Sequence, residues 1–437
     1  MYDTVIAGGR VADPEAGRIG FADVAIDRGR IAAIDARIPA TAARQVVDAT
    51  GAIVAPGLVD LHAHVAWRLN PLAVDADALA ASGGVTTWVD AGSAYATTIE
   101  GFREYVIARS AVRILALLRL GPQSSEILPT AVVAQSDADL LGAVAARHRD
   151  LVVGIKVSMG QCGIELLDLG LHAAAASDLP LMCHIAQRPP DIEEILDRMR
   201  PGDIVTHSAT GQTMRLVDDT AVLLPAVVRA RDRGVEFDLG HGAGSFSWAS
   251  AEALAAAGAL PTTISTDAWQ VAIRGPMFDL PTCMSKLLHL GMPLLDVIRA
   301  VTSRPAERVG RAGEFGTLRI GAPADLVLLD VHDGSFPLYD SAGEVRVARQ
   351  LIRARLTMRG GRPLRPGDLA PLADWLDVAM EAGLDPNPQG GLRPAVRRFQ
   401  EELVRLGHTP AAMAASAGAL VQPADPERPD PGKPPRA

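Results

Sequence analysis

The chain has 437 residues, of which 48% are hydrophobic and 21% are charged. This balance is typical of a folded globular protein and excludes wholesale disorder. Its 42 basic and 51 acidic residues give a formal net charge of −9, and no basic run offers a surface for a phosphate backbone. We therefore expect no nucleic-acid partner.

Short β-type segments occur at both ends of the chain. Residues 4–6, 24–26 and 31–34 alternate with glycine-containing turns, and similar segments return at residues 316–318, 324–329 and 351–358. We interpret residues 1–54 and 313–364 as two parts of one small β-sandwich domain.

Residues 55–312 show a different sequence pattern, in which short buried strands alternate with helical stretches. This alternation is typical of a parallel β/α architecture. A spacing of roughly 20 to 35 residues suits one strand, one helix and two loops per unit, and eight units predict a closed (β/α)8 TIM barrel of the α/β class. The predicted strands are Leu58–His62, Val85–Asp90, Arg113–Leu120, Leu151–Val157, Pro180–His184, Asp203–His207, Val235–Leu239 and Thr262–Asp267.

The sequence after the second β segment predicts a C-terminal extension. Residues 365–422 carry helical patterns near 372–382 and 395–406. The final stretch, residues 423–437, contains six prolines, so we expect a disordered tail there.

The redox and targeting signals indicate a cytoplasmic protein. The N-terminus lacks a basic stretch followed by an apolar core, and the apolar runs elsewhere are too short to span a membrane. The three cysteines, Cys162, Cys183 and Cys283, are an odd set without zinc-finger spacing. We expect no disulfide framework, no membrane partner and a reducing compartment.

Metal-ligating side chains mark the ends of five predicted strands. His62 and His64 are two residues apart on the first strand, so their side chains point the same way. The fourth, fifth, sixth and eighth strands end near Lys156, His184, His207 and Asp267. The carboxyl ends of parallel barrel strands share one face, where β/α barrel active sites lie. The pattern therefore predicts a metal site at that face.

Each of these residues also has an ordinary structural interpretation. A single barrel histidine is commonly a hydrogen-bonded core residue, Lys156 could pair with a neighbouring carboxylate, and Asp267 could cap the following helix. The other histidines provide an internal control, because most of them fall in helical or loop stretches. His148, His172, His289, His332 and His408 are of this kind, whereas His241 is ambiguous. Agreement across several strand ends favours the metal site.

These motifs resemble the amidohydrolase superfamily in its binuclear form. The resemblance covers about residues 2–363 and joins the stretch Pro56 to His64 with Lys156, His184, His207 and Asp267 in the expected order. The segments Gly84 to Thr87, Asp90 to Ser93, Gly101 to Tyr105 and Phe237 to Ser247 look like its deacetylase branch, close to dihydroorotases.

The resemblance implies two divalent metal ions, with zinc as the default. A carbamate formed on Lys156 by carbon dioxide would bridge one metal held by His62, His64 and Asp267 to another held by His184 and His207. A bridging hydroxide would attack the substrate carbonyl, and Asp267 would act first as general base and then as general acid. We expect a metal-dependent hydrolase that cleaves an acyl ester or amide bond.

The substrate is expected to be a small molecule that carries a carboxylate. Arg68, in the first loop beyond the paired histidines, is the first choice for a carboxylate clamp. The glycine-rich stretch after the seventh strand could present His241 and Ser245. The oligomeric state is left open, a homo-oligomer included.

A deaminase is disfavoured, because mononuclear deaminases of the superfamily that the chain resembles do not need the lysine of the fourth strand. Two further alternative functions are weighed. One is cyclic-amide opening; however, dihydroorotases usually carry a carboxylate-binding arginine where this chain has Ala66, and residues 157–163 contain no tyrosine of the hydantoinase kind. The other is a non-catalytic scaffold with the same fold. Such scaffolds usually lose metal ligands, whereas this chain retains the full set.

Overall fold

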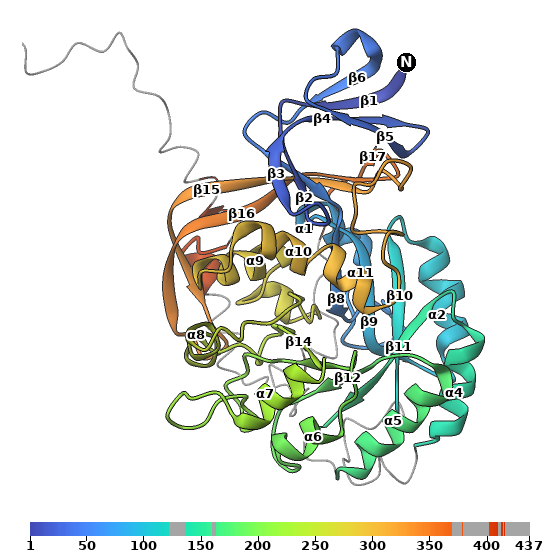
Figure 1. Ribbon diagram of the computed structural model, residues 1–437, viewed down its shortest axis with the longest axis vertical. Helices are drawn as coiled ribbons and strands as arrows, with labels where there is room; N and C mark the ends of the chain where they lie inside the picture. The colour runs from blue at the N-terminus through green and yellow to red at the C-terminus, as the bar shows by residue number, and fades with distance from the viewer. Residues whose placement is uncertain are drawn as a thin grey trace, which may run out of the picture.

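The computed structural model describes residues 1–121, 136–159, 163–368 and 402–409, together with residues 378, 412, 413 and 415. In this part of the chain a seven-stranded parallel sheet curls into a barrel, with helices around its outside (Figure 1). Its strands follow one another in sequence order. They are β8 (Leu58–Ala63), β9 (Val85–Tyr95), β10 (Arg113–Arg119), β11 (Val152–Ser158), β12 (Leu181–His184), β13 (Ile204–Thr206) and β14 (Glu236–Asp238).

The segment 262–268 closes the barrel without forming a regular strand, which corrects the predicted eighth strand, Thr262–Asp267. Its backbone bonds to both edges of the curled sheet: Leu239 N donates to Thr263 O (3.0 Å) and His64 N donates to Ala268 O (2.8 Å). Asp267 adopts a φ of 50°, a left-handed conformation that interrupts extended geometry. The predicted α/β barrel is confirmed, with an irregular eighth unit.

The helices begin and end at residues suited to those positions. Asp75 caps α1 by accepting a hydrogen bond from the Asp77 N–H, and Asp137 and Asp279 cap α4 and α9 in the same manner. Gly84 ends α1 with a φ of 73°. The α-helices are α1 (Ala76–Gly83), α2 (Ile99–Tyr105), α4 (Ala138–Arg147), α5 (Glu165–Ser177), α6 (Ile192–Arg198), α7 (Pro225–Asp232), α8 (Trp248–Ala256), α9 (Leu280–His289), α10 (Leu294–Ala300) and α11 (Ser303–Arg308). The named 3-10 turns are η1 (Ala40–Ala42), η2 (Ile107–Arg109) and η3 (Ala272–Arg274), and residues 402–405 are also helical.

Two mixed sheets from both ends of the chain lie beyond one end of the barrel (Figure 1). One has the order β5-β4-β1-β6 and the other β17-β16-β15-β7-β2-β3. Ile6 and Ile26 from the first sheet and Leu326 and Met358 from the second belong to one buried apolar cluster, which confirms the predicted small β domain. The strands are β1 (Tyr2–Ala7), β2 (Arg10–Asp13), β3 (Arg18–Phe21), β4 (Asp23–Asp27), β5 (Arg30–Asp35), β6 (Ala43–Asp48), β7 (Ile53–Pro56), β15 (Leu326–Tyr339), β16 (Val345–Arg359) and β17 (Arg362–Pro363).

The β15–β16 hairpin is longer than the predicted segments 324–329 and 351–358. It extends from the small sheets to the barrel helices, as the orange ribbon shows (Figure 1). Trp248 Nε1 of α8 donates to Leu338 O (3.2 Å), and Ile352 N donates to Ser285 Oγ of α9 (2.9 Å). Register shifts along the hairpin break the apolar alternation, so the sequence pattern does not reveal its outer half.

Most of the predicted C-terminal extension lies outside the described residues, as do the predicted helix near 372–382, except residue 378, and the tail 423–437. Residues 402–409 contact the rest of the protein: Leu403 is buried, and Tyr339 Oη lies 2.8 Å from His408 Nδ1. Cys183 and Cys283 are free and buried, and Cys162 is outside the described ranges. None of the described helices combines the length and hydropathy that a bilayer crossing requires.

Trp248 couples the hairpin to the barrel, because its side chain is fully buried and its indole N–H is bonded to β15. Trp248→Ala should lower the free energy of unfolding by about 3 to 5 kcal/mol, since it leaves a large cavity. Urea denaturation measures this change. Val228→Ala, at an exposed site on α7, should change the value by less than about 0.5 kcal/mol. Equal effects of the two substitutions would contradict the assigned role.

Candidate metal centre

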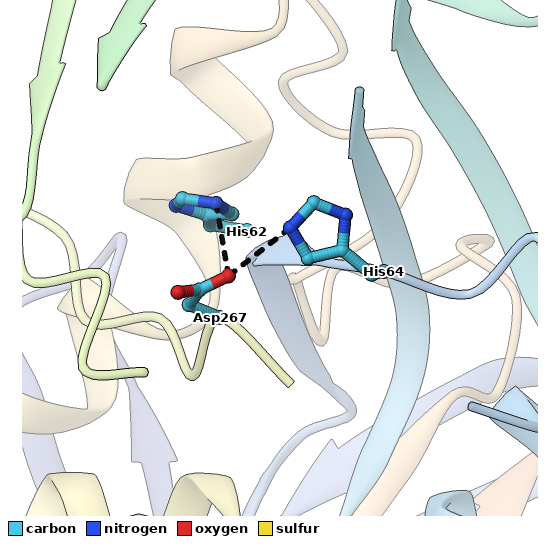
Figure 2. A group of neighbouring side chains, drawn as sticks. All are labelled: His62, His64 and Asp267. Atoms are coloured by element: carbon cyan, nitrogen blue, oxygen red, sulfur yellow. Dashed lines mark ion pairs between the residues drawn. The ribbon is translucent and has the colours of Figure 1, made fainter. Parts of the chain in front are cut away.

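His62, near the end of β8, and His64, just after that strand, both face Asp267. Nε2 of His62 lies 3.3 Å and Nε2 of His64 lies 3.2 Å from the same Asp267 oxygen, Oδ1 (Figure 2). The three residues form a group whose ligand atoms all lie within 4.8 Å of one another. Two imidazole nitrogens and a carboxylate oxygen in this arrangement can hold one divalent cation.

Hydrogen bonds on the far side of His62 fix its orientation and tautomer. Thr206 Oγ1 donates to Asp238 Oδ2 (2.7 Å), so its single proton is used and it must accept from His62 Nδ1 (2.8 Å). The Nε2 lone pair of His62 is therefore left for a metal. His64 is held similarly, with Nδ1 2.9 Å from Ser93 Oγ.

A second pair of histidines lies beside the first. His184 Nδ1 and His207 Nε2 are 3.1 Å apart, and His207 Nδ1 donates to Gly240 O. Burial lowers the pKa of His207 to about 4 and holds the pKa of His184 well below its usual range. Both rings are therefore neutral, as metal ligands must be.

Lys156 lies between the two groups. Its side chain is 2% exposed, and Nζ is 2.9 Å from His62 Nε2 and 3.5 Å from Met182 Sδ. Burial lowers the pKa of Lys156 to about 8; the charge of Asp267 opposes this shift and that of Arg119 adds to it. A Cβ atom at Gly92 would lie only 2.9 Å from Lys156 Cγ, so glycine provides the space for the lysine.

The structure thus brings all six residues predicted as metal ligands to one face of the barrel: His62, His64, Lys156, His184, His207 and Asp267. Four imidazoles and a carboxylate suit zinc and similar divalent ions. The group formed by His62, His64 and Asp267 fits one such ion, and His184, His207 and Lys156 lie beside it.

Two buried carboxylates that the sequence interpretation missed support this cluster. Asp238 accepts hydrogen bonds from Thr206, Thr263 and Ser265 at 2.6–2.7 Å. Asp60 accepts from the backbone N–H and the hydroxyl of Thr266, and burial raises its pKa to about 7. An aspartate inside an otherwise apolar strand needs such partners, and that was the signal in the sequence.

A cavity of about 70 Å³ opens onto the ligands. Its wall includes His64, Lys156, His184 and Asp267, and the predicted Ser245 also lies there. Sequence reasoning missed the other polar members of the wall, which are Asn70, Arg119 and Ser158.

The structure does not bring the other two predicted substrate residues to this cavity. The turn at Arg68 has a φ of 63° and leaves the side chain exposed, with its guanidinium 5.5 Å from the Trp67 ring centroid. His241 is fully buried, stacks on Phe246 and lies 2.5 Å through Nε2 from Lys286 Nζ. Its ring therefore contacts other buried side chains and does not line the cavity.

A larger cavity, of about 660 Å³, lies at the opposite end of the barrel, beneath the amino ends of β11 to β13. Its arginines are engaged by protein groups; for example, Arg200 pairs with Asp203 at 2.8 Å. Its lining includes none of the six predicted ligands. The amino end of a β/α barrel generally serves stability, so we place the chemistry at the smaller cavity.

The family model described as "Amidohydrolase family" matches residues 53–356, which contain the whole ligand cluster. The chain belongs to the amidohydrolase family. It is a hydrolase of that family, with a candidate metal site formed by His62, His64 and Asp267.

Proteins with differently named activities resemble this chain. A deacetylase of Agrobacterium fabrum, Atu3266, is 34% identical over 354 residues, covering 79% of this chain and 87% of the relative. A solved structure described as a dihydroorotase superposes with a TM-score of 0.77 at 32% identity, covering 85% of this chain and all of the other. One described as an adenine deaminase gives 0.76 at 30%, with 83% and 99% coverage. Overall similarity therefore fixes the family more firmly than the substrate.

Asp238 should control metal affinity through Thr206 and His62. Asp238→Asn removes the anion that orients this chain of hydrogen bonds, so we expect the affinity for zinc to fall by about 10- to 100-fold. Competition with a chromogenic chelator measures it. Asp197→Asn, at an exposed ion pair with Arg229, should leave the affinity unchanged. An unaltered affinity in Asp238→Asn would show that the buried carboxylate serves only the fold.

Proposed function

We propose that this amidohydrolase cleaves an acyl ester or amide bond of a small carboxylate-bearing molecule. The observation that carries the proposal is the convergence of two histidine pairs, Asp267 and the buried Lys156 at one face of the barrel. The similarity to a protein named as a deacetylase favours an acetyl group.

His62, His64 and Asp267 would hold one metal ion, and His184 and His207 another. When bound, the ions would polarise the substrate carbonyl and make hydroxide available near neutral pH. Lys156 would join the two sites after its Nζ has formed a bond to the carbon of carbon dioxide and lost a proton. Its lowered pKa supports this step, because only the neutral amine can react.

Asp267 would move the proton. Its carboxylate takes a proton from the attacking water, and the same proton passes to the leaving alcohol or amine as the bond to the acyl carbon breaks. The products are a carboxylic acid and an alcohol or amine. The backbone N–H of Asp267 donates to His62 O, which holds the acid beside the first strand.

Cyclic-amide opening is the second candidate, favoured by the similarity to a structure described as a dihydroorotase. Ala66 weighs against it, because the side chain at this position cannot bind a carboxylate. The scaffold interpretation loses support, because all six residues predicted as ligands are present and lie together.

A substrate panel tests the proposal. Zinc-loaded protein is assayed with O-acyl hydroxy acids, N-acyl amino acids, lactones and cyclic amides, beside Asp267→Asn. We expect turnover of acyl esters or amides, and a loss of at least about 100-fold in kcat for Asp267→Asn, since an amide is not a base. Activity on cyclic amides alone, or equal activity of the variant, would contradict the proposal.

Lys156 provides an independent check. Lys156→Ala should retain the fold but lose most bound metal, measured by inductively coupled plasma mass spectrometry, and small carboxylates such as formate should restore part of the activity. A ¹³C NMR spectrum of protein incubated with ¹³C-bicarbonate should show a carbamate resonance that the variant lacks. Full metal loading of Lys156→Ala would show that the lysine does not join the two sites.

A further inference from the structure

Arg119 occupies a place in the barrel that no motif indicated. It is the last residue of β10 and pairs in register with Lys156 of β11, with Leu120 N donating to Lys156 O (3.0 Å). A Cβ atom at Gly92 would lie 3.3 Å from Arg119 Cβ and 2.9 Å from Lys156 Cγ. The two basic side chains thus start side by side above the same glycine.

Arg119 is half-buried and forms part of the cavity wall together with His64, Lys156, His184 and Asp267. Among the described residues of that wall, it is the one arginine. Apart from these ligands and Arg119, the wall consists of neutral groups, among them Leu72, Ser245 and Trp269. A substrate that enters the cavity therefore meets the side chain of Arg119 beside the ligands.

Lys156 and Arg119 differ in what their basic groups can do, although they are neighbours across the sheet. Lys156 Nζ faces the ligand cluster, being 2.9 Å from His62 Nε2 and 3.5 Å from Met182 Sδ. A guanidinium stays charged at physiological pH, presents a planar fork of donors and matches a carboxylate in bidentate geometry. In a partly dehydrated cavity such a pair orients its partner more strongly than surface charges do.

We infer that Arg119 is the specificity-determining residue that binds the carboxylate of the substrate, so that the scissile acyl group is directed toward the metal ligands. This inference rests on the proposed function and assigns the anion-binding role to Arg119 rather than to the exposed Arg68. The ligand class is a small carboxylate with an acylated hydroxyl or amino group near it.

Matched pairs of compounds test the inference. O-Acetyl-lactate and N-acetyl-alanine are compared with their neutral primary amides in zinc-loaded wild type, Arg119→Gln, Arg119→Lys and Arg68→Gln. Arg229→Gln, at an exposed ion pair on α7, serves as a control. Calorimetry with lactate and lactamide gives a readout that needs no turnover, and metal content is measured in every variant.

We expect wild type to prefer the carboxylates. Arg119→Gln should lose about 10- to 100-fold in kcat/KM and in lactate affinity, mainly through KM, with little change on the amides or in metal content. Arg119→Lys should fall between the two, because it keeps the charge and loses the fork. Arg229→Gln should match wild type.

Several results would overturn the inference: no preference of wild type for lactate over lactamide, equal losses on acid and amide, loss of metal in Arg119→Gln, or loss of the preference in Arg68→Gln alone. Failure of the proposed function gives a different pattern, in which no acyl compound is hydrolysed while lactate binding still depends on Arg119.

Discussion

Asp238 is buried beneath the histidine cluster and has three hydroxyl donors around it. Burying an ionised carboxylate without partners costs folding free energy. Burial raises the pKa of Asp238, and the three hydrogen bonds oppose that shift. Because one of those hydroxyls also accepts from His62, the anion determines which imidazole nitrogen faces the cavity. Three barrel units, those of Thr206, Asp238 and Ser265, are thereby joined beneath the metal ligands.

The irregular eighth segment, residues 262–268, also contributes hydrogen bonds to buried carboxylates. Its side chains are used by buried carboxylates on both sides, since Ser265 donates to Asp238 and Thr266 donates to Asp60. The backbone then turns left-handed at Asp267, which aims the carboxylate at His62 and His64. Gly242 leaves the necessary room, because a Cβ atom there would lie 2.6 Å from Asp267 Oδ2. The strand loses regularity where the ligand needs a particular direction.

The sequence predicted what depends on local periodicity. The alternation of strands and helices, together with ligands at strand ends, was sufficient for the barrel and for the cluster around His62. It could not show that Arg68 stays outside the cavity while Arg119 is part of its wall. The position of Arg68 depends on a turn with a φ of 63°, and that of Arg119 on its pairing with Lys156 across the sheet. Neither feature can be recognised from the local sequence pattern. His241 illustrates the same limit: its partner Lys286 is 45 residues away.

The pairing of β7 with β15 has a consequence for biosynthesis. Pro56 and Leu326 are partners in this ladder, so some 270 residues must be made between them. During vectorial synthesis the amino-terminal sheet can form early, yet Ile6 and Ile26 lack their counterparts Leu326 and Met358 until β15 and β16 have been made. The nascent chain therefore keeps an apolar face open while the whole barrel emerges from the ribosome.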